Sequence, residues 1–343
     1  MSVEKFDPSG YAIHNDNFIG LPYDEQSANL ILVPVPWEAT VSYAAGTAQA
    51  AQNILDASYQ LDLLDWDYPN AWKIGIYMQP MEGIVLQKSE ETRALATQHI
   101  DALESQQPID AERLEQVNEA SESLNNWVYR KTKALLEQGK LVGLVGGDHS
   151  TPFGYLQALA EQHADFGILQ IDAHCDLRKA YEGFEYSHAS IFYNVLEQNK
   201  AVSKLVQVGI RDACEEEIEY AEASQNRVEI YTMPMLRAGA YTHKKSFDAY
   251  CQEIVNKLPQ KVYISFDIDG LDPKLCPNTG TPVPDGLEMN ETFYLIHQVV
   301  ASGRKIIGFD LSEVGTATEW DGNVGARVLY KLCNAAGVSN GLV

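Results

Sequence analysis

Short apolar segments alternate with amphipathic segments along most of this chain. The apolar runs, such as Leu141–Val145 and Lys261–Asp267, are nearly continuous, which is typical of strands that are buried on both faces. Strands of this kind alternating with helices predict a parallel sheet with helices on both sides. The predicted strands are residues 28–35, 73–77, 141–145, 167–172, 204–208, 228–231, 261–267 and 305–311. The predicted helices are residues 49–59, 111–138, 151–161, 188–198, 215–222, 246–257, 290–301 and 324–336.

The composition limits the classes of partner. The 343 residues include 25 Lys and Arg against 48 Asp and Glu, a formal net charge of −23. Such an acidic surface repels phosphate backbones and anionic lipids, so we expect neither a nucleic acid nor a membrane partner. The five cysteines form no Cys-x-x-Cys pair, and the first residues show no basic start followed by an apolar run. We therefore expect reduced thiols and a cytoplasmic location.

Polar residues follow four of the predicted strands. Gly-Gly-Asp-His-Ser occupies residues 146–150, and Asp-Ala-His-Cys-Asp occupies residues 172–176. Asp267 and Asp269 end a third strand, and Glu313 follows a fourth. The carboxyl ends of parallel strands meet at one edge of a sheet, where ligands bind. The sequence therefore predicts a functional site at this edge.

The spacing within these segments predicts a metal site. In extended backbone, side chains alternate between two faces, so Asp172, His174 and Asp176 share a face, as do Asp267 and Asp269. Carboxylates crowded at the end of an apolar strand repel one another and lose hydration unless a cation neutralises them. Four aspartates carry the charge that two divalent ions would balance.

The ligand set favours manganese. Carboxylates with some imidazole and no thiolate suit Mn²⁺, with Fe²⁺, Co²⁺ and Ni²⁺ as alternatives. Two ions roughly 3.5–4 Å apart would share a water and convert it to hydroxide near neutral pH. Our hypothesis has Asp172 and Asp267 bridging the two ions. The first ion would be bound by His149, Asp172, Asp176 and Asp267, and the second by His174, Asp172, Asp267 and Asp269.

These motifs, together with Ser-Phe-Asp-Ile-Asp-Gly-Leu-Asp-Pro at residues 265–273, resemble the signatures of the ureohydrolases. That superfamily includes arginase, agmatinase, guanidino-acid hydrolases and formimidoylglutamase. The resemblance implies a three-layer α/β/α fold around an eight-stranded, mostly parallel sheet, two Mn²⁺ ions, and a homo-oligomer, either a trimer or a hexamer. We interpret residues 1–343 as a single domain, with residues 1–27 as an N-terminal extension and the metal-site motifs within 146–313.

The resemblance also implies roles for individual residues. His188, in Ser187-His188, matches a histidine that shuttles protons, and Glu313 matches a glutamate that binds the guanidinium group. In the mechanism we predict, a metal-bridging hydroxide attacks the guanidino carbon, and Asp269 passes its proton to the leaving nitrogen. The products would be urea and an amine.

Arg178 is the residue that leaves more than one substrate class possible. Asp-Leu-Arg at residues 176–178 resembles formimidoylglutamase, and an arginine there suits a substrate carboxylate. The alternative for Arg178 is an ion pair with Glu182 or Glu185. The resemblance to formimidoylglutamase gives an alternative reaction, the release of formamide from N-formimidoyl-glutamate. An alternative of another class is a non-catalytic partner subunit; loss of metal ligands would mark it, and none of the expected ligands is missing.

Overall fold

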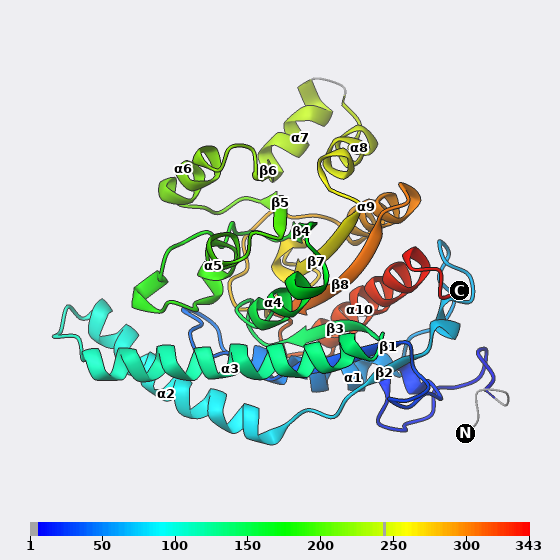
Figure 1. The fold of residues 1–343 in the computed structure, drawn as a ribbon, viewed down its shortest axis with the longest axis horizontal. Coiled ribbons are helices and arrows are strands. Elements are labelled where there is room, and N and C mark those ends of the chain that lie inside the picture. The colour runs from blue at the N-terminus through cyan, green and yellow to red at the C-terminus, as the bar shows by residue number, and fades with distance from the viewer. Residues whose placement is uncertain (1–5, 243–244) are drawn as a thin grey trace.

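A single sheet of eight parallel strands forms the centre of the protein (Figure 1). The structure is a computed structural model that describes residues 6–242 and 245–343. The order across the sheet is β2-β1-β3-β8-β7-β4-β5-β6, and every neighbouring pair is parallel. The strands are β1 (Leu30–Val35), β2 (Ile76–Met78), β3 (Leu141–Gly146), β4 (Phe166–Ile171), β5 (Val202–Ile210), β6 (Val228–Thr232), β7 (Lys261–Asp267) and β8 (Lys305–Ser312).

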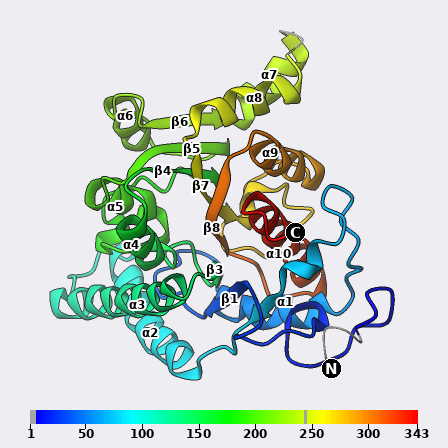
Figure 2. The ribbon, with the colours of Figure 1, turned by 45° about the vertical axis from the view of Figure 1, so that its right-hand side comes forward.

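Helices cover both faces of this sheet, which confirms the predicted three-layer α/β/α fold. One face is packed against α3, α4, α5 and α6, and the other against α1, α8, α9 and α10 (Figure 2). The helices are α1 (Ala50–Ser58), α2 (Gly83–Glu104), α3 (Ala111–Glu137), α4 (Phe153–Gln162), α5 (Ile191–Gln198), α6 (Glu215–Ala223), α7 (Met233–Thr242), α8 (Phe247–Lys257), α9 (Met289–Ala301) and α10 (Glu319–Ser339).

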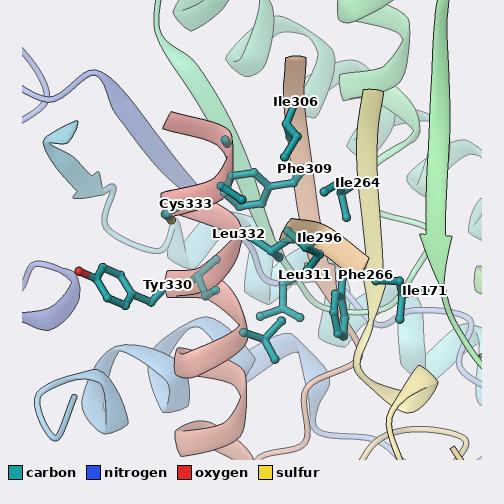
Figure 3. Packing of buried hydrophobic residues seen from close by; sticks show 14 of the residues in the cluster. Ile171, Ile264, Phe266, Ile296, Ile306, Phe309, Leu311, Tyr330, Leu332 and Cys333 are labelled. Atoms are coloured by element: carbon teal, nitrogen blue, oxygen red, sulfur yellow. The ribbon is translucent and has the colours of Figure 1, made fainter. Parts of the chain in front are cut away.

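Alternate residues of each strand enter two separate cores. On β7, Ile264 and Phe266 pack toward α9 and α10, whereas Tyr263 packs toward the α3–α6 face. Figure 3 shows Ile264 and Phe266 in the core that also contains Leu311 of β8 and Leu332 of α10. This period of two is that of a strand buried on both sides, and it decides which face each polar residue of the sheet occupies.

The predicted strands all exist; β7 has the predicted bounds, and the other seven are shifted at one or both ends. The strand predicted at residues 73–77 begins only at Ile76, because Ala71–Ile74 forms a 3-10 turn first. Helix α2 was not predicted, because much of its buried face consists of small or polar residues that hydropathy does not reveal, including Ser89, Thr92 and Ala96. Residues 1–5 of the predicted N-terminal extension lie outside the described residues, whereas Phe18 and Leu21 are buried in the core. The single-domain interpretation stays a prediction.

In the described part of the chain, no helix combines the length and the apolar character needed to span a bilayer.

Candidate functional site

Loops at the carboxyl ends of β3, β4, β7 and β8 converge at the predicted edge. Gly147 opens the first loop, and a Cβ there would lie 1.7 Å from the carbonyl oxygen of Trp37, so only glycine lets the two backbones approach. The amide of Asp148 then donates to the same carbonyl at 2.7 Å. This close approach fixes the loop that carries His149.

His149 is surrounded by carboxylates from two other loops. Its Nδ1 atom lies 2.9 Å from Asp176 Oδ2, 3.0 Å from Asp172 Oδ2 and 3.3 Å from Asp267 Oδ2. The side chain is only 1% exposed. One group of potential metal ligands therefore consists of His149, Asp172 and Asp267, and Asp176 lies beside it.

A second group shares Asp172 with the first. His174 Nδ1 lies 3.0 Å from Asp269 Oδ2 and 3.6 Å from Asp172 Oδ1. The ligand atoms of Asp172, His174 and Asp269 all lie within 4.8 Å of one another, as do those of the first group. The structure thus brings together the six predicted ligands, five of them in two groups that share Asp172 and the sixth, Asp176, beside the first group.

The local conformation differs from the extended backbone that we predicted. Strand β4 ends at Ile171, and Asp176 has a left-handed φ of 54°. Residues Ile268–Gly270 form a 3-10 turn that Asp267 caps by accepting a hydrogen bond from the Asp269 amide. Turns rather than strand alternation therefore aim these side chains. A left-handed non-glycine residue is strained, and such residues concentrate at functional sites.

Burial and mutual proximity shift the pKa values of the candidate ligands. Burial and the charge of Asp172 raise the pKa of Asp176 to about 7. Burial, with Asp269 and Asp172 nearby, holds the pKa of Asp267 well above its usual value. Burial lowers the pKa of His149, but the neighbouring carboxylates outweigh it and raise that pKa well above the usual value. Burial is the largest single contribution to each shift, and the crowded carboxylates add to it for the two aspartates and oppose it for His149.

The donor atoms fit divalent cations. His149 Nδ1 is buried and makes no hydrogen bond, although it faces three carboxylates. A buried nitrogen without a partner is costly, and a metal ion would remove that cost. Oxygen and imidazole donors with no thiolate suit Mn²⁺ and its neighbours.

Glu313 and His188 adjoin these groups. Glu313 Oε1 accepts a hydrogen bond from the His149 amide at 3.0 Å and lies 3.3 Å from His188 Nδ1. Glu313 Oε2 and His188 Nε2 are both buried without a hydrogen-bond partner. Burial lowers the pKa of His188, but the Glu313 carboxylate more than offsets this and raises it. Glu313 also has a left-handed φ of 61°.

A cleft of about 170 Å³ opens beside the candidate ligands. Arg178 lines it, with Cζ 4.8 Å from the centre of the Tyr181 ring. Its Nε atom lies 3.7 Å from Glu217 Oε2, so the ion-pair alternative with Glu182 or Glu185 was wrong about the partner. Glu217 is far along the chain, at the start of α6, and sequence proximity could not identify it. The cleft-lining residues that we did not predict are Ser42, Tyr181, Ala189, Asp212, Ala213, Glu217 and Thr281.

Comparison with known proteins identifies the family. A family model described as "Arginase family" matches residues 28–336. The chain belongs to the arginase family. This confirms the resemblance to the ureohydrolases, and the relatives of this arginase-family chain carry the names of hydrolases.

Two relatives illustrate the likeness in sequence. The chain is 29% identical over 322 residues to N(1)-aminopropylagmatine ureohydrolase of Thermus thermophilus, covering 93% of this chain and 94% of the relative. It is 32% identical over 212 residues to guanidinobutyrase of Pseudomonas aeruginosa, covering 60% of this chain and 63% of the relative.

Solved structures share the fold of this arginase-family chain. Proclavaminate amidinohydrolase of Streptomyces clavuligerus has a TM-score of 0.73 at 22% identity, with 96% of this chain and 100% of that one covered. Formiminoglutamase of Trypanosoma cruzi, a structure with Mn²⁺, has a TM-score of 0.69 at 15% identity, with 94% of this chain and 98% of that one covered.

Proposed function

We propose that this arginase-family protein is a ureohydrolase that holds two divalent ions, preferably Mn²⁺, and hydrolyses a guanidino compound to urea and an amine. The observation that carries the proposal is that Asp172 belongs to two adjoining groups of potential ligands. The Mn²⁺ in the related formiminoglutamase structure supports the choice of metal. In the proposed assignment, His149, Asp172, Asp176 and Asp267 hold one ion, and His174, Asp172, Asp267 and Asp269 hold the other.

The protein groups around the ions would bind the substrate and move protons. When bound, such ions acidify water and stabilise negative charge that develops on the substrate. Glu313 Oε2 is a buried acceptor without a partner, so it offers a guanidinium group a charge-assisted hydrogen bond. His188 lines the cleft with Nε2 unpartnered, which suits proton exchange with solvent. Asp269 would carry a proton to the leaving nitrogen.

The tail of the substrate would meet Arg178. Its side chain is 38% exposed and lines the cleft, and its contact with Glu217 is long at 3.7 Å. Both Glu217 oxygens already accept hydrogen bonds, from the amides of Leu177 and Cys214. Arg178 therefore keeps donors for a carboxylate, and we propose that guanidino acids are better substrates than agmatine.

One assay tests the reaction class. Metal-free protein is reloaded with Mn²⁺ or Ni²⁺ and given guanidino acids, agmatine and N-formimidoyl-glutamate, with protein kept in chelator as the control. We expect urea from the guanidino substrates only after reloading. Formamide from N-formimidoyl-glutamate, without urea from the others, supports the formimidoylglutamase alternative. If neither product appears with any substrate, the non-catalytic alternative holds.

The setting of the enzyme is part of the proposal. All five cysteines are free thiols, which agrees with a reducing, cytoplasmic compartment. We also propose a homo-oligomer, either a trimer or a hexamer, and light scattering of the purified protein would measure it.

A further inference from the structure

Four buried polar side chains cross the middle of the sheet on adjacent strands. Gln207 of β5 pairs in register with Gln170 of β4, Gln170 pairs with Ser265 of β7, and Ser265 pairs with Asp310 of β8. All four residues are 0% exposed. Buried polar groups in a sheet are costly unless they are hydrogen-bonded, so four of them in one line require an explanation. We call these four residues the polar row.

The polar row lies directly beneath the candidate ligands. Asp172 follows Gln170 by two positions, and Asp267 follows Ser265 by two positions. The row touches the ligands directly, because Gln170 Nε2 lies 2.8 Å from Asp172 Oδ2 and Ser265 Oγ lies 2.9 Å from His149 Nε2. The residues that flank the row, such as Ile264 and Leu311, belong to the opposite core. The row therefore forms a layer between the ligands and the apolar part of the sheet.

One arm of the row controls the ring of His149. The Ser265 hydroxyl donates its single proton to Asp310 Oδ2 at 2.7 Å. Ser265 Oγ lies 2.9 Å from His149 Nε2, and it can only accept there. The Nε2 atom must therefore carry a proton, which leaves the lone pair of a neutral ring on Nδ1. Nδ1 is the atom that faces Asp172, Asp176 and Asp267.

The other arm controls the shared carboxylate. Gln207 Nε2 donates to Gln170 Oε1 at 2.5 Å and to the carbonyl oxygen of Cys175 at 2.6 Å. Because the oxygen of the Gln170 amide is fixed in this way, its nitrogen faces the ligands. It donates to Asp172 Oδ2 at 2.8 Å and to the carbonyl oxygen of His174 at 3.2 Å.

We propose that the polar row is a positioning layer for the two-ion centre. The Ser265–Asp310 arm selects the His149 tautomer that can bind a cation, and the Gln207–Gln170 arm orients Asp172. Partners behind the ligands fix tautomer and orientation in this manner at metal sites generally. The inference rests on the proposed function, because it assumes that these ligands bind divalent ions.

The two arms predict different metal-binding defects. Metal-free wild type, Ser265→Ala and Gln170→Leu are titrated with Mn²⁺ by calorimetry, and the bound metal is counted. Ser265→Ala should lower the affinity for one of the two Mn²⁺ ions by about 10–100-fold and leave the affinity for the other unchanged. Gln170→Leu should lower the affinity for both ions, because Asp172 belongs to both groups of potential ligands. Thr132→Val is the control, because it removes a buried hydroxyl on α3 that bonds only to carbonyls of its own helix.

A spectroscopic measurement separates positioning from a general loss of stability. Long-range proton–nitrogen NMR spectra of the metal-free protein report the His149 tautomer when they are recorded on the alkaline side of the raised His149 pKa, where the ring is neutral, and His149→Gln assigns the signal. Wild type should show the proton on Nε2, and Ser265→Ala should show a mixture. The inference is overturned if both variants bind two Mn²⁺ with wild-type affinity, or if Ser265→Ala keeps the wild-type tautomer. A wild type that binds no Mn²⁺ instead contradicts the proposed metal centre as well.

Discussion

Glu313 Oε1 lies 3.3 Å from His188 Nδ1, and the outer atoms of both side chains, Oε2 and Nε2, are buried without partners. The inner atoms of the pair thus contact each other, whereas the outer atoms have no hydrogen-bond partner within the protein. An anionic acceptor and a titratable ring held together in this way suit a cationic substrate whose leaving nitrogen must gain a proton. The first two predictions concern this arrangement.

Replacing Glu313 by glutamine removes its charge and keeps its shape. We expect kcat/KM to fall by about 10–100-fold, because a hydrogen bond between ions contributes roughly 1.5–3 kcal/mol. Steady-state assays with the best substrate of the panel measure the effect, and bound Mn²⁺ should stay at the wild-type level. Unchanged kcat/KM contradicts the assignment of the guanidinium site.

Gly280 provides space for the same carboxylate. A Cβ at this position would lie 2.8 Å from Glu313 Oε2, closer than normal contact. Gly280→Ala should therefore displace that oxygen and lower kcat/KM, with little change in the melting temperature. Gly83→Ala is the matched control, since a Cβ there meets nothing within 4 Å. Equal activity of the two variants argues against a role for Oε2.

Asp267→Asn tests the proposed bridge between the two ions. The substitution removes one negative charge from the crowded ligand groups, so metal content and activity should fall together. Metal analysis after dialysis and urea release are measured on the same sample, with the exposed Asp165→Asn as the control. Normal turnover with two bound ions refutes the bridging role.

Arg178→Ala tests the substrate tail. If Arg178 binds a carboxylate, KM for guanidino acids should rise about 10-fold or more, while KM for agmatine stays the same or falls. Kinetics on both substrates, for wild type and variant, measure the difference. A parallel change for both substrates shows that Arg178 acts only through Glu217 and Tyr181.

A buried ion pair outside the site should dominate local stability. Lys331 of α10 lies 2.7 Å from Asp65, and their side chains are 7% and 5% exposed. Lys331→Met leaves the Asp65 carboxylate buried with Asn334, so the free energy of unfolding should fall by about 3–5 kcal/mol at pH 7. Denaturant titrations measure the change. A loss below about 1 kcal/mol would mean that water screens the pair.

The pH dependence of this pair has a definite sign. Burial raises the pKa of Asp65, but hydrogen bonds from Lys331 and Asn334 outweigh it, so the net pKa lies below the usual 3.8. A depressed folded-state pKa stabilises the protein above pH 3.8, and that contribution is lost as the pH falls through the folded value. The gap between wild type and Lys331→Met should therefore shrink in acid.

The chemical identity of the site was readable from the sequence because its residues are clustered. His149, Asp172 and Asp267 each follow a run of apolar residues, and a parallel sheet brings such strand ends to one edge. The polar row was missed, although Gln170 and Gln207 interrupt otherwise apolar strands. Their meaning depends on register, because only the pairing of β4 with β5 and β7 shows that they are neighbours.

Alternation of strands and helices determined the fold class, and the spacing of acidic and imidazole groups determined which residues could bind metal. Tertiary structure decided the rest. It placed Glu217 beside Arg178, left Glu313 Oε2 without a partner, and aligned Ser265 with Asp310 behind His149. The physical reason is the distance along the chain over which each interaction acts. Local pattern governs backbone conformation and burial, whereas hydrogen-bond partners from strands far apart along the chain depend on how the sheet is ordered and registered.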